Sequence, residues 1–283
     1  MRYIRGTSIS GVMAELERGA TILGGGTILT RDLALGIRRI ERLVDTESVE
    51  ALQRVVERPT CRIIGARVTL ARLAEGSVMH REHTALAQAA ARVGNPQIRR
   101  AATIGGNLVA GVSGLADTWP ALLALDAQID VCERDRSTRL ELDVLAERWQ
   151  PHMFVTALVL PRDDRRSAFV KFAWRRASGK PIANLAASAH VEQGRLYAAK
   201  WVAGGLGPRP VPLSQIEREL EGATQSEACD KAEALAAASV ASGDGRGDGR
   251  GDGRGVGRGV RSEYLASLLA SGIKQIVREL CGT

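Results

Sequence analysis

Residues 20–30 read ATILGGGTILT and residues 97–108 read QIRRAATIGGNL, and these two glycine-rich stretches decide how the rest of the chain is interpreted. In the first, apolar residues typical of a β-strand lead into three glycines and Thr27, and a short helical segment follows. Glycine lets an anion approach the backbone N–H groups of such a turn closely. The second stretch places Thr103 before Gly105, Gly106 and Asn107. We predict that both are turns that bind the pyrophosphate of a dinucleotide.

Neither stretch matches the better-known nucleotide-binding motifs. The glycines at 24–26 do not continue into GxGxxG, and no acidic residue stands alone at the expected strand end, which disfavours NAD binding of the Rossmann type. The chain contains no GxxxxGK[ST] sequence either. A glycine triplet after a strand is most often an ordinary turn, so each stretch by itself is a weak signal.

Composition places the chain among ordinary globular proteins. Its 283 residues are 45% hydrophobic and 25% charged, and they suffice for two or three domains. No apolar run approaches the roughly 18–20 residues that span a bilayer, and the amino terminus lacks the apolar core of a signal peptide. We therefore expect a cytoplasmic protein without a membrane span.

The charge distribution argues against a nucleic-acid-binding protein, and the placement of cysteine and histidine argues against a metalloprotein. The net charge of +7 is spread along a chain with only 4% aromatic residues, a pattern that disfavours nucleic-acid binding. The cysteines and histidines form no ligand cluster, although His80 and His83 could share a helix face. These residues are Cys61, Cys132, Cys229, Cys281, His80, His83, His152 and His190. We expect no metal or iron–sulfur cluster in this chain.

Hydrophobic periodicity predicts a first domain over residues 1–165, with α/β subdomains at about 1–47 and 48–165, and a second domain over 166–283. The second domain should combine an antiparallel sheet with helices. Predicted helices cover residues 13–18, 30–35, 70–75 (capped by Thr69), 84–93, 119–125, 213–220, 226–241 and 264–280. Predicted strands cover residues 20–23, 39–44, 62–65, 128–132, 155–160, 169–172, 186–191 and 196–202.

Residues 244–255 consist of three Asp-Gly-Arg-Gly repeats, which decay over 256–259. Half of these residues are glycine and none before Val256 is apolar, so no burial can offset the entropy lost on ordering. We predict a flexible loop over 243–260. An RGG-like RNA-binding segment is the alternative, but the alternating aspartates cancel most of the arginine charge.

Taken together, ATILGGGTILT and GNPQIRRAATIGGNLVAG (94–111) resemble the flavin subunit of molybdenum hydroxylases of the xanthine dehydrogenase and carbon monoxide dehydrogenase type. The first loop of that family reads alanine, two glycines and Thr or Ser, and Gly24 stands at the alanine position here. The second reads I-R-x-x-A-T-x-G-G-N, matched by Ile98, Arg99, Ala102, Thr103, Gly105, Gly106 and Asn107. The resemblance covers essentially the whole chain except the Asp-Gly-Arg-Gly stretch.

The resemblance implies an α+β fold. A two-part FAD-binding domain of the PCMH/vanillyl-alcohol-oxidase type would be followed by a C-terminal α+β domain of the carbon monoxide dehydrogenase flavoprotein type. FAD would be held without a covalent bond, because neither loop contains His or Cys. Some relatives place an aromatic ring over the flavin at the position of Val93, which is aliphatic here, so no stacking ring is assigned.

The resemblance also implies which residues contact FAD. In GLADTWPALLALDAQIDV (114–131), Asp117 would hydrogen-bond hydroxyls of the ribityl chain or ribose, and in FVKFAWRR (169–176), Lys171 would reach the polar edge of the flavin ring. The complete predicted set is Ile22, Leu23, Gly24, Gly25, Gly26, Thr27, Ile28, Leu29, Thr103, Ile104, Gly105, Gly106, Asn107, Asp117 and Lys171.

The family assignment further implies partners. Electrons would come from a molybdenum cofactor in a large molybdopterin-binding subunit through two [2Fe–2S] clusters in a small iron–sulfur subunit. In such a complex no residue of this chain need act as acid, base or nucleophile, and the sequence shows only scattered candidates for these roles. FAD would pass the electrons to NAD or a quinone, in a dimer of heterotrimers. A stand-alone FAD-dependent oxidoreductase, with its own substrate pocket, and a non-enzymatic RG-rich binding protein, without flavin, are the alternatives.

The repeat gives the first testable prediction. Deleting residues 243–255 should leave the FAD content and thermal stability nearly unchanged, because loop length affects stability only weakly. The flavin absorbance per polypeptide and the melting temperature of the two forms measure this. Loss of flavin on deletion would contradict the loop interpretation, and specific retention of RNA by the full chain would favour the RNA-binding alternative.

Overall fold

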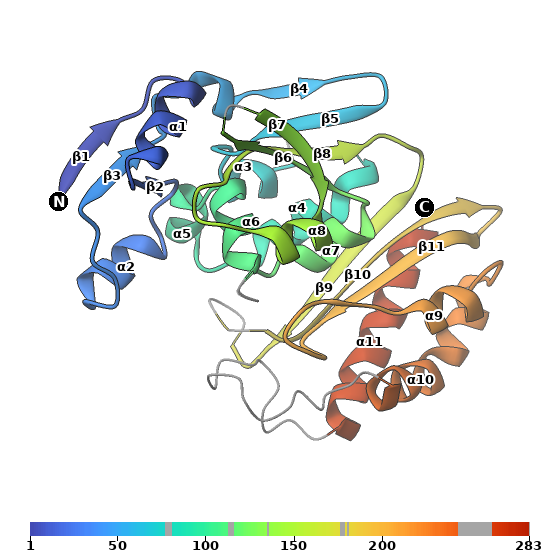
Figure 1. The fold of residues 1–283 in the computed structure, drawn as a ribbon. Coiled ribbons are helices and arrows are strands. Elements are labelled where there is room, and N and C mark those ends of the chain that lie inside the picture. The colour runs from blue at the N-terminus through green and yellow to red at the C-terminus, as the bar shows by residue number, and fades with distance from the viewer. Residues whose placement is uncertain are drawn as a thin grey trace. The chain divides into compact units, whose positions relative to one another are not determined.

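The computed structural model describes residues 1–76, 81–112, 116–134, 136–175, 179, 181–242 and 262–282. The chain is an α+β protein that forms two compact units (Figure 1). The first unit comprises residues 1–78, 96–116 and 126–162, and the second comprises residues 79–95, 117–125 and 163–283. The Asp-Gly-Arg-Gly stretch and His80 lie outside the described residues.

A small parallel sheet opens the first unit. Its strands are β1 (Arg2–Arg5), β3 (Arg42–Asp45) and β2 (Thr21–Leu23), in the order β1-β3-β2. Helix α1 (Ile9–Glu17) is capped by the Ser8 hydroxyl, and helix α2 (Leu29–Ala34) follows β2. The sequence pattern missed β1, whose residues are mostly exposed and carry an arginine at each end. The predicted strand over 39–44 begins three residues too early.

The second sheet of this unit is antiparallel, in the order β4-β5-β8-β6-β7. Its strands are β4 (Val55–Glu57), β5 (Cys61–Gly65), β8 (Phe154–Pro161), β6 (Gln128–Glu133) and β7 (Arg136–Glu141). The associated helices are η1 (Glu50–Gln53), α3 (Leu70–Ala74), α5 (Pro96–Ala101), α6 (Ile104–Val112) and α8 (Leu142–Arg148). The predicted Thr69 cap is confirmed, since its hydroxyl accepts a hydrogen bond from the Arg72 N–H at 3.3 Å.

The second unit contains the antiparallel sheet predicted for the C-terminal part, in the order β12-β11-β10-β9. Its strands are β9 (Arg166–Ala173), β10 (Pro181–Glu192), β11 (Arg195–Gly204) and β12 (Val211–Pro212). Its helices are η2 (Arg81–His83), α4 (Thr84–Ala91), α7 (Trp119–Ala124), α9 (Ser214–Glu219), α10 (Gln225–Ser242) and α11 (Ser262–Cys281).

Helices α10 and α11 pack against each other beside this sheet, and their apolar side chains form one hydrophobic core with those of the sheet (Figure 1). Apolar side chains of α11, such as Ile273 and Ile276, are buried with Leu185 and Trp201 of the sheet. Gly272 allows the close approach of α11, because a Cβ there would lie 3.2 Å from atoms of Phe172 and Val170. The buried apolar side chains of α11, the last predicted helix, therefore face the sheet.

The division into units differs from the linear domains predicted from sequence order. Residues 79–95 and 117–125 belong to the second unit although they precede residue 163. Helix α4 packs on β9, and α7 packs on β10 and β11, which explains their membership. Packing partners of this kind are distant in sequence, so hydrophobic periodicity does not reveal them.

Candidate functional site

The first glycine stretch forms a loop between β2 and α2 with unoccupied backbone donors. The N–H groups of residues 24–27 have no hydrogen-bond acceptor within the part of the chain that the structure describes. The loop is held at its far end, where the carbonyl of Gly26 accepts hydrogen bonds from the Thr30 N–H at 2.8 Å and from its hydroxyl at 2.7 Å. Gly26 has a φ of +72°, which only glycine adopts readily. Consecutive N–H groups of this kind bind an anion.

The structure brings the two glycine stretches together, as the predicted shared site requires. A Cβ on Gly25 would lie 1.9 Å from the carbonyl oxygen of Ala101, and one on Gly24 would lie 3.1 Å from the Thr103 hydroxyl. No side chain fits at Gly25 without moving the backbone of the second stretch. Gly25 is therefore required for close packing of the two stretches, in addition to any approach of a ligand, whereas a Cβ at Gly24 would meet only a side-chain hydroxyl.

The second stretch is not a turn, and that prediction is wrong. Residues 104–112 form helix α6, and Gly105 and Gly106 lie in its first turn. The N–H groups of residues 104–107 donate to the carbonyl oxygens of Ala66, Val68 and Thr103 and to the Thr103 hydroxyl, at 2.9–3.2 Å. This stretch therefore supplies no second set of free N–H donors. Its residues remain among those predicted to contact FAD.

Close helix packing is the physical reason for glycine at position 105 of the second stretch. A Cβ on Gly105 would lie 2.7 Å from the Cβ of Ala66 and 3.0 Å from its carbonyl oxygen. Gly105 thus lets the start of α6 reach residues 66–68. The sequence signal was ambiguous, because glycines after a threonine can begin either a turn or a tightly packed helix.

Beside the first loop lies a pocket of about 450 Å³, entirely within the first unit. Its lining comprises Gly24, Gly25, Asp45, Glu47, Gln53, Arg67, Thr69, Arg100 and Ala101. The Arg67 guanidinium donates to the carbonyl oxygen of Gly24 at 2.5 Å. Sequence reasoning missed Arg67 and Arg100, because Arg67 lies outside both glycine stretches and Arg100 stands at a variable position of the second.

The carboxylate of Asp45 is oriented by its own partners. It accepts hydrogen bonds from the Tyr3 hydroxyl at 2.5 Å and from the Glu47 N–H at 2.9 Å. The bond to Asp45 is the main reason that the pKa of the Tyr3 hydroxyl is raised. Glu47 itself is exposed. The pocket therefore combines cations near the glycine loop with carboxylates able to accept hydrogen bonds from hydroxyl groups.

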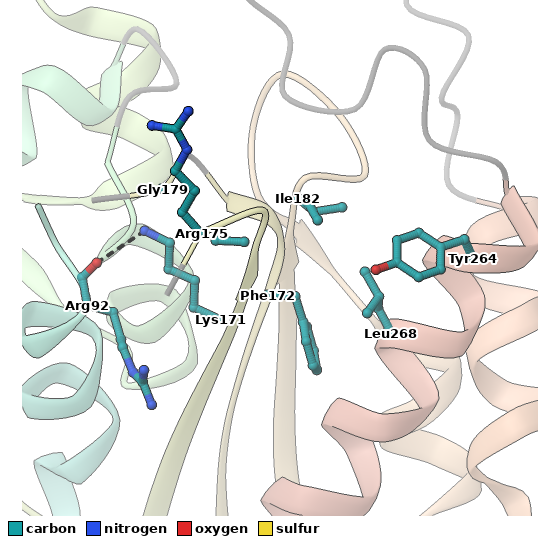
Figure 2. Close-up of a pocket in the computed structure, with 9 residues that line it drawn as sticks. Arg92, Lys171, Phe172, Arg175, Gly179, Ile182, Tyr264 and Leu268 are labelled. Carbon is teal, nitrogen blue, oxygen red and sulfur yellow. Dashed lines mark hydrogen bonds between the residues drawn. The ribbon is translucent and has the colours of Figure 1, made fainter. Parts of the chain in front are cut away.

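In the second unit, the two remaining predicted residues form a buried ion pair. The Lys171 ammonium lies 2.6 Å from a carboxylate oxygen of Asp117, and their side chains are 6% and 14% exposed. Lys171 also donates to the carbonyl oxygen of Arg92 at 3.1 Å (Figure 2). Burial raises the pKa of Asp117, and the charge and hydrogen bond of Lys171 oppose this rise. The sequence placed both residues at the cofactor but did not predict that they bind each other.

Lys171 also lines a pocket of about 230 Å³ within the second unit. The lining comprises Arg92, Lys171, Phe172, Ala173, Arg175, Gly179, Ile182, Tyr264 and Leu268. Figure 2 shows Tyr264 and Leu268 projecting from α11 and Phe172 from the sheet. Val93 is not part of this lining. The pocket thus joins aromatic side chains with several cationic ones.

The other predicted residues flank the glycine loop. Ile22 and Leu23 are in β2, while Ile28 and Leu29 begin α2, and all four are partly buried. Across the described ranges, no group of three or more His, Cys, Asp or Glu side chains is placed to hold a metal ion. No helix among the same residues is long and apolar enough to cross a membrane.

Comparison with known proteins identifies the family. Residues 1–163 match the family model described as the FAD binding domain in molybdopterin dehydrogenase. Since the match covers more than half of the chain, the chain belongs to this family. It is an FAD-binding subunit of the molybdenum hydroxylase type and part of an oxidoreductase.

Individual relatives agree with this assignment. The chain is 26% identical over 223 residues to the xanthine dehydrogenase FAD-binding subunit of Escherichia coli O157:H7, covering 72% of this chain and 73% of the relative. It is 29% identical over 216 residues to the nicotinate dehydrogenase FAD-subunit of Eubacterium barkeri, covering 71% and 72%. Its fold resembles a chain of quinoline 2-oxidoreductase from Pseudomonas putida 86, with a TM-score of 0.83, 19% identity and coverage of 99% and 96%.

The buried ion pair predicts a pH-dependent change in stability. In Lys171→Met, the influences that lower the pKa of Asp117 are lost, so this raised pKa rises further. A carboxyl group whose pKa is higher in the folded than in the unfolded state binds its proton more tightly in the folded state, which stabilises the fold at low pH. This stabilisation is lost as the pH rises through the pKa of the folded state. As the pH rises above the unfolded carboxyl pKa of about 3.9, the variant should therefore lose more stability than the wild type, by about 3–5 kcal/mol once Asp117 is fully ionised.

Urea unfolding at a series of pH values measures this difference. Lys171→Arg, which keeps a cation beside Asp117, is the matched control and should follow the wild-type profile closely. In the double variant Asp117→Asn/Lys171→Met, the additional pH dependence should disappear. An Lys171→Met profile parallel to that of the wild type would show that the pair does not control the pKa of Asp117.

Proposed function

We propose that this chain is the FAD-carrying electron-transfer subunit of a molybdenum hydroxylase. In this role it accepts electrons from [2Fe–2S] clusters of a partner subunit and passes them to an external acceptor. The observation that carries the proposal is the loop at 24–27, whose N–H groups lack acceptors in the described chain while the family match covers this loop. A pyrophosphate supplies the acceptors that such a loop needs.

The residues present fit FAD. The loop at 24–27 would hold the pyrophosphate through its N–H groups, and the cations of Arg67 and Arg100 lie in the pocket beside it. Thr103, which lies next to Gly24, would contribute to the pyrophosphate site. The start of α6 would shape that site and not donate hydrogen bonds to it, because its first N–H groups already have acceptors. In the second unit, Asp117 and Lys171 would accept from the cofactor's hydroxyls and donate to the ring's polar edge, respectively.

FAD, when bound, supplies the chemistry of accepting and releasing electrons. The side chains of this subunit bind and orient it, and none needs to act as acid, base or nucleophile. Lys171 holds its charge against Asp117 in a buried environment, which fixes the direction of its ammonium group. Because both side chains of the pair have little freedom to turn, the Lys171 ammonium would be oriented in advance to donate a hydrogen bond to the edge of the flavin ring.

The partners follow from the proposed role. If iron–sulfur centres reduce the flavin, they must lie in another chain, because no group of three or more His, Cys, Asp or Glu among the described residues is placed to hold a metal. We infer a small iron–sulfur subunit and a large molybdopterin-binding subunit, assembled as a dimer of heterotrimers, with NAD or a quinone as the external acceptor. The relatives whose names describe them as FAD-binding subunits of xanthine and nicotinate dehydrogenases support a multi-subunit arrangement.

A charge placed next to the glycine loop should test the pyrophosphate site. Gly106 is exposed in the first turn of α6, and a Cβ there would lie 3.2 Å from the Thr103 hydroxyl. Gly106→Asp should weaken FAD binding about tenfold or more, because like charges a few ångströms apart repel by about 1–4 kcal/mol. Gly106→Asn has nearly the same size without the charge and should retain most of the flavin.

The visible spectrum and the flavin released by acid, per mole of polypeptide, provide the measurement. Release by acid also tests the prediction that FAD is not covalently attached. If Gly106→Asp and Gly106→Asn lose flavin equally, the effect is steric and the charge argument fails. Flavin that stays on the denatured chain would contradict non-covalent binding.

The electron route requires the intact complex. Anaerobic addition of the complex's organic substrate should bleach both the iron–sulfur and the flavin absorbance. The separated flavin subunit should be reduced by dithionite but not by that substrate, because its electrons come from the partner. Turnover of the substrate by the lone chain at the rate of the intact complex would instead establish a stand-alone flavoenzyme.

A further inference from the structure

We infer that Arg67 is a positioning residue for the phosphate-binding loop, acting through the carbonyl of Gly24. The inference rests on the proposed function, since it concerns the site where FAD would bind. Arg67 lies outside both glycine stretches and 43 positions from Gly24, so no motif contains it. Its guanidinium nevertheless donates to the Gly24 carbonyl oxygen at 2.5 Å.

This hydrogen bond fixes the orientation of one peptide group in the loop. A trans peptide is planar, and its C=O and N–H point in opposite directions. When Arg67 holds the carbonyl of Gly24, the N–H of Gly25 must point away from the guanidinium. Gly25 lies close to the second stretch, since a Cβ there would lie 1.9 Å from the carbonyl oxygen of Ala101. The direction of its donor is therefore set from both sides.

Arg67 is itself held rigidly at its backbone. Its N–H donates to the carbonyl oxygen of Leu52 at 2.8 Å, and Leu52 is buried. The neighbouring carbonyls of Ala66 and Val68 accept from the first N–H groups of α6 at 2.9 Å. The same three residues, 66–68, thus contact both glycine stretches. A side chain that starts from so fixed a backbone can hold its target in one position.

The Arg67 guanidinium has more N–H donors than this one hydrogen bond uses. A guanidinium carries five N–H donors, and the Gly24 carbonyl is its only side-chain partner within the described residues. Glycine loops are flexible, and ordering one on binding costs free energy. A hydrogen bond that orders the loop beforehand reduces this cost. Loss of Arg67 should therefore weaken binding of any ligand that carries the pyrophosphate, whether or not it carries a flavin ring.

ADP and FAD are the probes, because they share the pyrophosphate and only FAD contains the ring. In the full chain freed of flavin, Arg67→Met should raise the Kd of both ligands by the same factor, about tenfold to a hundredfold, as expected for a hydrogen bond involving a charged group. Arg67→Lys, which keeps a donor of similar reach, should recover most of the affinity. Calorimetry for ADP and flavin fluorescence for FAD give the two constants.

Salt separates positioning from simple attraction between charges. Raising the salt from about 0.1 M to about 1 M shortens the screening length from about 10 Å to 3 Å. The loss in Arg67→Met should persist at high salt, whereas Arg100→Met, which removes an exposed charge from the same pocket, should show a smaller loss that fades. Arg58→Met, at an exposed position outside the pocket lining, should bind like the wild type.

The possible outcomes distinguish this inference from the proposed function. If the wild type binds FAD, and Arg67→Met binds ADP and FAD as tightly as the wild type does, only the positioning role is overturned. A loss that vanishes at high salt overturns it as well, because Arg67 would then act only as a charge. Failure of the wild type to bind either ligand overturns the proposed function and the inference together. Urea unfolding of each variant verifies that affinity is compared between folded chains.

Discussion

The attachment of residues 66–68 to the start of helix α6 is the constraint on which the candidate site depends. Two carbonyls of this segment accept the N–H groups of Ile104 and Gly105, and the contact is possible only because Gly105 has no side chain to strike Ala66. The segment is tied to the sheet in turn, through the bond from the Ala66 N–H to Thr156 in β8. The sheet therefore holds in place the residues just before α6, at 101–103, against which the glycine loop packs.

The two glycine stretches consequently have different tasks. The first presents backbone donors that nothing in the described chain satisfies, a costly arrangement unless water or a ligand accepts from them. The second has its donors occupied and provides a surface against which the first is packed. A binding loop and its support are thus combined in one unit. This division explains why both stretches carry glycine although only one resembles an anion-binding turn in structure.

The buried pair of Asp117 and Lys171 shows how a polar site is maintained in the second unit. Burial alone would favour the neutral carboxyl group, and the lysine beside it counters that preference. Replacing only one of the two by an uncharged residue would leave the other charge buried and unpaired, which is far more costly than losing an exposed pair. The pair also fixes two functional groups in space. Order of this kind suits a site that binds a redox cofactor and leaves the chemistry to it.

Several features followed from the sequence because they depend on local physics. Hydrophobic periodicity identified β9, β10 and β11 of the C-terminal sheet, though not the two-residue β12, and the Thr69 cap marked the start of α3. The spacing of the glycine stretches, through its resemblance to a family, indicated FAD. These signals reside in neighbouring residues, whose conformations are limited by sterics and by burial of one face.

Only the tertiary structure decided what those residues contact. Whether Gly105 begins a turn or a packed helix depends on Ala66, which lies far away in sequence. The same is true of Arg67 and Gly24, and of Lys171 and Asp117. Each of these contacts is set by the packing of strands and helices that are separate in the chain. A single sequence contains the residues for such contacts but no local pattern that pairs them, because the energy of a contact depends on distance in space.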